Sequence, residues 1–331
     1  MTTLVILTTM DSVVLGCDSL GTATRPMIDP SQLVEFFDPS NAYKLKVDQK
    51  GEPLLTDITR LYPKFQEIPA SHMTHVDKLF SLSPLDMGVM FAGITSVGDR
   101  TVKSLVDEFK NGEEFLGVSF EDYTLEGIGE SLLKFIGPYY LKQYPLDWNR
   151  PALELMIGGY DGQHPNPGVA RIDVHLNKVT SVNYGFWIYL GGQSTEIERI
   201  VFGTDSLNLG KMKNHELALL NAYHALLTTY LQQQGSTTGL PKPEALSAQL
   251  KLVDWSDLNG LASVWEAFSE QNAIDCVDFL VTLMAKSQQF SPKMPTVGGE
   301  VNIAIVRRTK GFTFVSKREL RHGDNVVPLD E

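Results

Sequence analysis

The second residue of the chain is a threonine, and removal of the initiator methionine would leave it with a free α-amine beside its own hydroxyl. Methionine aminopeptidases act where the next side chain is small, as the side chain of Thr2 is. An alcohol is a poor nucleophile at its free pKa, but an α-amine titrates near ~8 and can accept the hydroxyl proton. Thr2 could therefore supply both the nucleophile and the base of an acyl-transfer reaction. Threonine is also common after methionine, so by itself Thr2 is better explained as an ordinary strand residue.

A lysine and an aspartate are each embedded in apolar sequence. Lys78 precedes Leu79 and Phe80, and Asp18 ends an apolar, β-branched run that begins at Ser12. Burying a lysine is costly unless a carboxylate meets it, and such a pair perturbs the pKa of neighbouring groups. The pattern predicts an ion pair between Lys78 and Asp18. The alternative is that Lys78 extends its ammonium to solvent and Asp18 caps a turn.

Runs of apolar and β-branched residues predict the strands that would position these side chains. The predicted strands are residues 2–9, 12–18, 78–82, 87–93, 153–160, 169–175, 180–190, 300–307 and 312–317. The first two form a hairpin with its turn at Met10 and Asp11. Short connections between consecutive strands predict antiparallel pairs.

Apolar residues spaced three and four apart predict helices between the strand pairs. The predicted helices are one with Val102, Leu105, Val106 and Phe109 and an N-cap at Asp99, residues 124–143 with Pro138 as a candidate break, residues 195–202, residues 212–234, and one with Ile274, Val277, Leu280, Val281 and Met284. This order predicts an α+β sandwich rather than a parallel wound sheet. We expect a single domain, residues 1–331, with insertions at 22–75 and 206–262. The first insertion is interrupted by prolines and lacks periodicity.

The composition of the 331 residues excludes several classes of partner. A net charge of −12 has the wrong sign for a protein that binds nucleic acid or an anionic membrane, and no apolar run approaches the ~18 residues that span a bilayer. The two cysteines, Cys17 and Cys276, support neither a disulfide framework nor a cysteine zinc site, so a cytoplasmic setting is expected. His72 and His75 have a helix-compatible metal spacing but no evident third ligand. We predict no metal and no cofactor.

Five short segments between the N-terminus and Gly93 form a further pattern. They are Thr2-Thr3-Leu4-Val5-Ile6, the turn at Asp11, residues 13–19, residues 77–80, and Phe91-Ala92-Gly93. Together they resemble the β-subunit family of proteasomes and their bacterial ring-protease relatives. Asp18 stands sixteen residues after Thr2, as in that family, and Gly16-x-Asp18-Ser19 ends the second strand as the family pattern requires. The resemblance implies an N-terminal nucleophile (Ntn) hydrolase with a four-layer αββα sandwich.

The resemblance also implies catalytic roles for four residues. Thr2 would be the nucleophile, and Lys78 would lower the pKa of its amine and stabilise its alkoxide. Asp18 would hold Lys78 in place, and the backbone N–H of Gly93 would donate to the oxyanion. Residues 19–77 separate Asp18 from Lys78, which is a longer connection than the family usually has.

Substrate-binding positions are implied as well, and here the chain departs from the family. Phe91 lies where the family lines its first specificity pocket. Where the family has a Gly-Ser-Gly turn, Gly192 takes the place of the serine and Ser194 is nearby. Met294 and Val297 stand where an Asp and a Ser usually assist the nucleophile. Either the catalytic residues suffice with different supporting side chains, or the chain keeps the fold without the activity.

Three functions remain open at this point. The first is a threonine hydrolase that cleaves peptide or amide bonds through an acyl ester on Thr2. The second is a catalytically inactive proteasome-like assembly or binding protein. The third is a small-molecule amidase, acylase or acyl-transfer enzyme of the Ntn superfamily. The family typically assembles into rings, so a homo-oligomer is expected, whereas the sequence holds no recognisable docking motif for an ATPase partner.

Overall fold

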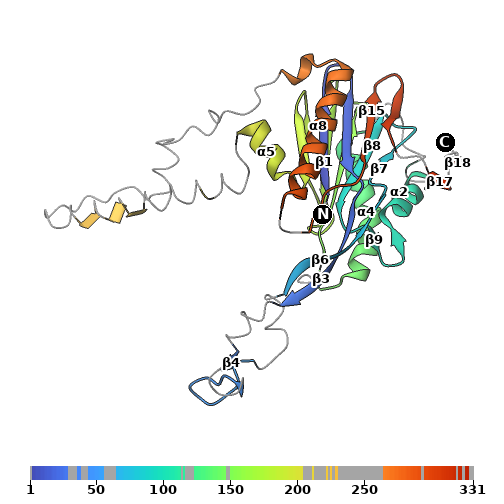
Figure 1. Ribbon diagram of the computed structural model, residues 1–331. Coiled ribbons are helices and arrows are strands. Elements are labelled where there is room, and N and C mark those ends of the chain that lie inside the picture. The colour runs from blue at the N-terminus through green and yellow to red at the C-terminus, as the bar shows by residue number, and fades with distance from the viewer. Residues whose placement is uncertain are drawn as a thin grey trace. The chain divides into compact units, whose positions relative to one another are not determined.

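The computed structural model describes residues 2–28, 36–38, 44–55, 65–112, 115, 123–146, 150–203, 211, 221–222, 224–225, 228–229, 264–291, 294–317, 320–322 and 325–327. The chain divides into two compact units, Met1–Gln193 with Trp265–Glu331, and Ser194–Val264. The first unit contains two five-stranded sheets (Figure 1). In the second unit, helix α5 (Thr195–Phe202) buries Ile197 and Val201 and ends at Gly203 in the left-handed conformation.

The first sheet contains the N-terminal hairpin and the C-terminal hairpin. Its strand order is β14-β1-β2-β15-β16, and every neighbouring pair is antiparallel. The strands are β1 (Thr3–Thr8), β2 (Val13–Asp18), β14 (Ile188–Gly192), β15 (Val301–Arg307) and β16 (Gly311–Ser316). Every residue of β1 and β2 is buried. A strand buried on both faces needs a layer on each side.

The second sheet has the order β13-β12-β11-β8-β7 and is also antiparallel. Its strands are β7 (Leu79–Ser81), β8 (Met87–Gly93), β11 (Leu153–Gly159), β12 (Gly168–Asp173) and β13 (Lys178–Tyr184). The short strands β9 (Ser96–Val97) and β10 (Arg100–Thr101) pair with each other after β8, as do β17 (Leu320–His322) and β18 (Asn325–Val327) near the C-terminus.

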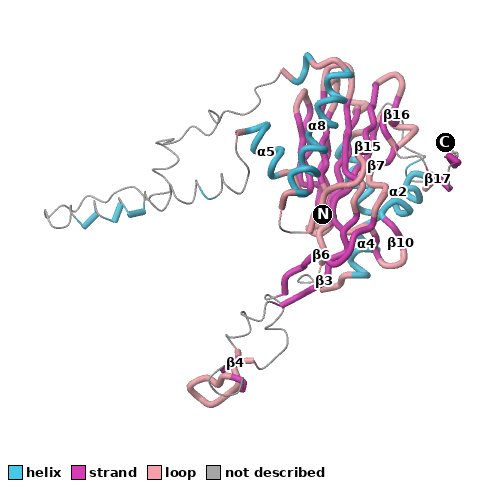
Figure 2. Tube along the Cα trace, viewed as in Figure 1, coloured by secondary structure: helices cyan, strands magenta, loops and turns pink. Residues whose placement is uncertain are grey.

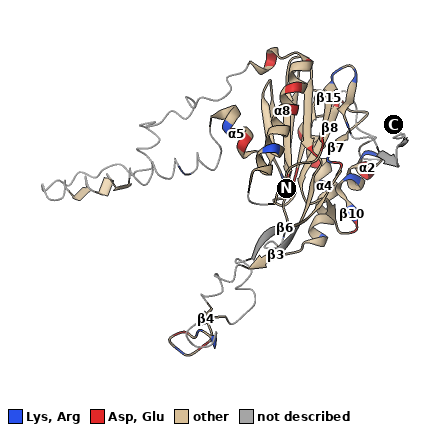
Figure 3. Cartoon of the chain, viewed as in Figure 1, with Lys and Arg blue, Asp and Glu red and all other residues tan. Residues whose placement is uncertain are grey.

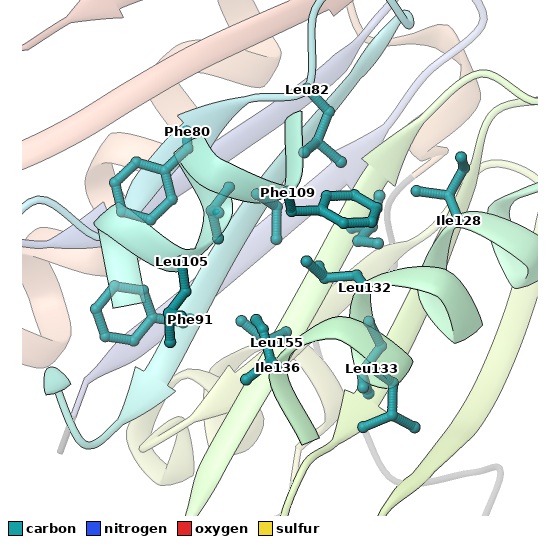
Figure 4. Packing of buried hydrophobic residues seen from close by; sticks show 14 of the residues in the cluster. Phe80, Leu82, Phe91, Leu105, Phe109, Ile128, Leu132, Leu133, Ile136 and Leu155 are labelled. Atoms are coloured by element: carbon teal, nitrogen blue, oxygen red, sulfur yellow. The ribbon is translucent and has the colours of Figure 1, made fainter. Parts of the chain in front are cut away.

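The two sheets pack against each other through an apolar cluster that draws on both. It includes Leu4, Ile6, Val13 and Leu15 from the first sheet and Leu79, Met90, Met156 and Val169 from the second. Helix α8 (Glu270–Gln289), preceded by the 3₁₀ turn Trp265–Ala267, packs on β1, β2 and β15. Helices α2 (Val102–Lys110) and α4 (Leu125–Gln143) cover the second sheet, where their leucines and Phe109 meet Phe80, Phe91 and Leu155 (Figure 4). The second sheet therefore buries residues on both faces, against the first sheet on one side and against α2 and α4 on the other.

Most of the predicted elements are present, with three corrections. Residues 180–190 form two strands rather than one. Strand β13 ends before Gly185, which has a positive φ, and β14 begins after it in the other sheet. Helix α2 is capped by the hydroxyl of Thr101, which accepts from the N–H of Ser104, and not by Asp99. Helix α4 continues through Pro138 without a break.

The segment predicted as an irregular insertion contains regular structure. Strands β3 (Gly21–Ile28) and β6 (Phe65–Met73) pair over most of their length, and β4 (Phe37–Asp38) pairs with β5 (Lys44–Leu45) (Figure 2). Prolines occur within β3 and β6, which is compatible with a two-stranded ribbon because each strand has a free edge. Most of the predicted helix at 212–234 lies outside the described residues.

Asp161 connects helix α4 to the second sheet through hydrogen bonds. Its carboxylate accepts hydrogen bonds from the N–H of Leu125 at 2.9 Å, the hydroxyl of Tyr184 at 2.6 Å and the N–H of Gln163 at 2.7 Å. Leu125 is the first residue of α4, whose free N–H groups and helix dipole both favour a carboxylate.

We expect Asp161→Ala to lower the free energy of unfolding by about 3 kcal/mol, because it leaves a buried helix N–H without an acceptor. Tyr184→Phe removes one of the three bonds and should cost about 1 kcal/mol. Urea unfolding of both variants measures the difference. Equal losses would show that the helix N–H is satisfied in another way.

Candidate active site

Asp18, the last residue of β2, is surrounded by hydrogen-bond donors. Its Oδ1 accepts from the N–H of Thr3 at 3.0 Å. Its Oδ2 accepts from the ammonium of Lys78 at 3.2 Å, from the N–H of Leu20 at 3.2 Å and from the N–H of Gly298 at 3.1 Å. Asp18 is therefore the common partner of the N-terminal strand, the start of β7 and the loop before β15.

The Lys78–Asp18 pair is closed off from solvent. Both side chains are 1% exposed, and the Lys78 ammonium also donates to the carbonyl oxygen of Leu20 at 2.6 Å. Burial raises the pKa of the Asp18 carboxyl, while the Lys78 ammonium and the N–H groups of Thr3 and Gly298 oppose that shift. A buried pair of this kind costs desolvation energy, which its mutual attraction and further hydrogen bonds must offset. The site thus keeps a cation and a carboxylate at low dielectric.

The peptide group between Thr2 and Thr3 is held from both sides. Its carbonyl oxygen, on Thr2, accepts from the N–H of Gln193 at 2.7 Å, and its N–H, on Thr3, donates to Asp18. The Thr3 hydroxyl donates to the carbonyl oxygen of Gln193 at 2.5 Å. Thr2 itself is 2% exposed. The backbone that carries the Thr2 hydroxyl is therefore fixed in direct contact with Asp18, the partner of Lys78.

Gly192 brings the start of β1 close to the end of β8. Its φ of +62° favours glycine, and a Cβ there would lie 2.0 Å from the Thr2 carbonyl oxygen and 3.0 Å from the Cβ of Ala92. No larger residue fits this position without moving Thr2. The glycine that stands where the family has a serine thus allows Thr2 to approach Ala92 and its neighbour Gly93.

The orientation of Gly93 follows from the strand pairing. The N–H of Phe91 donates to the carbonyl oxygen of Lys78 at 3.2 Å. Successive N–H groups of a strand point alternately to its two neighbours, so the N–H of Gly93 leaves β8 on the same edge as that of Phe91. This edge of β8 faces Lys78, which directly precedes the first residue of β7. At Gly93 the chain has a φ of +113° and lies against the carbonyl of Ala152.

The structure links Thr2, Asp18, Lys78 and Gly192 through direct contacts, and Gly93 follows Ala92, which lies close to Gly192. Among the described residues, however, no hydrogen bond joins the Lys78 ammonium to the Thr2 hydroxyl. The connection between them passes through Asp18 and the backbone N–H of Thr3.

Two of the residues singled out in the sequence have other surroundings. Phe91 is 1% exposed and stacks on Phe80 with ring centroids 6.0 Å apart, so it is part of the core beneath the helices. Ser194 belongs to the second unit, where its hydroxyl donates to Glu198 at 2.7 Å. As packed here, neither side chain offers a free group to a substrate.

The residues at the two departures from the family pattern are apolar, but polar groups lie between and beside them. Met294 is 43% exposed and Val297 is buried. The intervening Thr296 donates its hydroxyl to the Oε1 of Gln193 at 2.6 Å, and Gln288 accepts from the N–H of Thr296. No sequence motif had singled out these three polar residues, Gln193, Thr296 and Gln288. One signal was visible, since Gln288 follows Met284 by four residues on the buried face of α8.

A groove of about 510 Å³ includes in its lining two residues, Leu153 and Glu154, that contact Gly93 and Gly192. Leu153 pairs with Gly93 across the sheet, and Glu154 accepts from the N–H of Gly192 at 3.0 Å. The groove is lined by Arg150, Ala152, Leu153, Glu154, Arg171, Asp173, His175 and Thr180. Glu154 also pairs with Arg171 at 3.2 Å, so part of the lining charge is already compensated.

Within the described residues, no group of three or more histidine, cysteine, aspartate and glutamate side chains is placed to hold a metal ion. No helix in this part of the chain is long and apolar enough to cross a membrane. Cys17 packs between the sheets, where burial raises its thiol pKa, so it is not a reactive thiolate. No protein-family model matches the chain, and a search of the curated proteins found no match.

Proposed function

We propose that this chain is a threonine-type Ntn hydrolase of the proteasome β-subunit kind, which cleaves peptide or amide bonds through an acyl ester on Thr2. The order of its layers supports the proposal, because α8 packs on the first sheet and α2 and α4 cover the second. This is the order expected of an αββα sandwich. The observation that carries the proposal is that the N–H of the Thr2–Thr3 peptide group donates to Asp18, which forms a buried ion pair with Lys78.

The proposed reaction begins once processing frees the α-amine of Thr2. The Thr2 hydroxyl attacks the substrate carbonyl and passes its proton to that amine, while the N–H of Gly93 donates to the oxyanion. The amine then protonates the leaving amine, and water hydrolyses the ester with the same amine as base. Lys78 favours the neutral form of the amine because a nearby positive charge lowers its pKa. An acceptor amine in place of water would give acyl transfer.

The inactive scaffold is kept as a second candidate because of one observation. Thr2 is buried, and its hydroxyl makes no hydrogen bond to the Lys78 ammonium among the described residues. A binding protein that uses Thr2 only as the first strand residue would have these same contacts.

The two candidates predict different states of the N-terminus. For the enzyme, we expect the intact mass of the purified protein to be lower by one methionine, with Thr2 as its first residue. A peptide β-lactone should then acylate that residue, because the Thr2 oxygen opens the lactone ring and the ring oxygen takes up a proton. Mass spectrometry of the intact protein and of its N-terminal peptide measures both events. A retained methionine, or a lactone adduct elsewhere in the chain, would favour the scaffold.

A further inference from the structure

A chain of hydrogen bonds leads from Thr2 to the last turn of α8. The N–H of Gln193 donates to the Thr2 carbonyl oxygen, and the side-chain Oε1 of Gln193 accepts from the hydroxyl of Thr296 at 2.6 Å. The Oε1 of Gln288 accepts from the N–H of Thr296 at 2.6 Å and from the N–H of Val297 at 2.9 Å. Three regions far apart in sequence are therefore linked, and Gln193 is the one that contacts Thr2, the residue proposed as the nucleophile.

Gln288 is an unusual member of its helix. The other buried residues of α8 are apolar: Ala273, Val277, Leu280, Val281 and Met284. The helix also carries acidic and basic residues (Figure 3), of which Asp275, Asp278 and Lys286 are exposed. Gln288 is 9% exposed, and its Nε2 has no hydrogen-bond partner among the described residues. A buried donor left unpaired costs about 1–3 kcal/mol. The two hydrogen bonds that the amide oxygen of Gln288 accepts, from the N–H groups of Thr296 and Val297, offset this cost.

The loop that carries Thr296 is also fixed at its other end. The carbonyl oxygen of Pro295 accepts a hydrogen bond from the Nε2 of His72, a residue of strand β6, at 2.8 Å. The N–H of Gly298 donates to Asp18. Residues on both sides of Thr296 are thus anchored, and the direction of its hydroxyl toward Gln193 is set by the surrounding structure.

We propose that Gln193, Thr296 and Gln288 position Thr2 for attack and replace the Asp and Ser that the family resemblance placed at Met294 and Val297. The proposal rests on the function proposed above. Thr296 and Gln288 are positioning residues, because they reach Thr2 only through Gln193. Loss of the Thr296 hydroxyl would let the Gln193 side chain rotate and would weaken the hydrogen bond from the backbone N–H of Gln193 to the Thr2 carbonyl oxygen. Small displacements of reacting groups lower the reaction rate strongly.

The test is Thr296→Val, which keeps the shape of the side chain and removes the hydroxyl. We expect β-lactone acylation of Thr2 and kcat for a fluorogenic peptide to fall by about 10- to 100-fold with little change in KM. Thr296→Ser keeps the hydroxyl and should restore most of the rate. Thr8→Val is the matched control, since Thr8 is a buried residue at the far end of β1 that donates to the carbonyl of Gly185. It should lower stability and leave both rates unchanged.

A second readout does not depend on catalysis. Amide hydrogen exchange at Gln193 should be faster in Thr296→Val than in the wild type or in Thr296→Ser. Wild-type acylation rates in Thr296→Val together with unchanged exchange at Gln193 would overturn the positioning role and leave the hydrolase intact. No adduct on wild-type Thr2 would instead overturn the proposed function and, with it, any catalytic role of these residues.

Discussion

Thr2→Ala is expected to abolish peptide and amide hydrolysis, with kcat/KM reduced by at least about a thousandfold. Alanine is as small as the methionine aminopeptidases require, so the variant should still be processed and should expose an α-amine. Only the hydroxyl is missing. Fluorogenic peptides and a panel of small amides, assayed with both proteins, measure the effect and separate a peptidase from a small-molecule amidase.

The matched control for this experiment is Thr8→Ala, which removes a hydroxyl from the other end of the same strand. It should fold with reduced stability and keep its turnover. Thr2→Ser is informative as well, because it keeps the oxygen nucleophile and should retain measurable activity. Turnover by Thr2→Ala at the wild-type rate would rule out the nucleophile proposed here. No turnover by any of the proteins, the wild type included, would favour the inactive scaffold.

The elements that position Thr2 were predictable because their signals are local. The continuous apolar runs of β1 and β8 and the spacing of Val277, Leu280 and Val281 in α8 depend only on near neighbours in the chain. The Lys78–Asp18 pair was predictable for a related reason, since a lysine inside an apolar strand requires a carboxylate.

Other features depend on contacts that no local pattern encodes. Residues 180–190 are uniformly strand-like, yet β13 and β14 join different sheets, and this division is decided by tertiary packing on either side of Gly185. The bond from Thr296 to Gln193 spans 103 positions. A threonine beside a loop proline and a glutamine in the last turn of a helix are common, and only their contact in the folded chain suggests the proposed positioning role.

The second large effect is expected for Lys78→Met. Loss of the ammonium removes the charge proposed to lower the pKa of the Thr2 amine and to stabilise the alkoxide, so kcat should fall by at least about a hundredfold. The acid limb of the pH profile of kcat/KM should also move to higher pH, because an amine without a neighbouring cation holds its proton more tightly. A merely structural role for Lys78 would lower the amount of active enzyme and leave this pH profile in place.

Stability provides an independent measurement on the same variant. Methionine at position 78 leaves the Asp18 carboxylate buried without its counter-charge, which should cost about 3–5 kcal/mol near neutral pH. Burial already raises the pKa of Asp18, and without Lys78 the folded-state pKa should rise further above its unfolded value near ~3.9. A carboxyl group with a raised folded-state pKa adds stability below its unfolded pKa and loses it as the pH rises through the folded-state value. The deficit of Lys78→Met against the wild type should therefore shrink on acidification from pH ~7 toward pH ~4.

Lys103→Met is the matched control for this argument, because Lys103 pairs with Asp107 at 2.7 Å on the surface of α2, where both side chains are more than 40% exposed. An exposed pair contributes little, so this variant should lose no more than about 1 kcal/mol, show no comparable pH dependence and keep full activity. Urea unfolding at several pH values compares the two lysines directly. Equal, small losses from both would mean that Asp18 does not need Lys78 in the folded chain, and the electrostatic basis of the proposed active site would then be wrong.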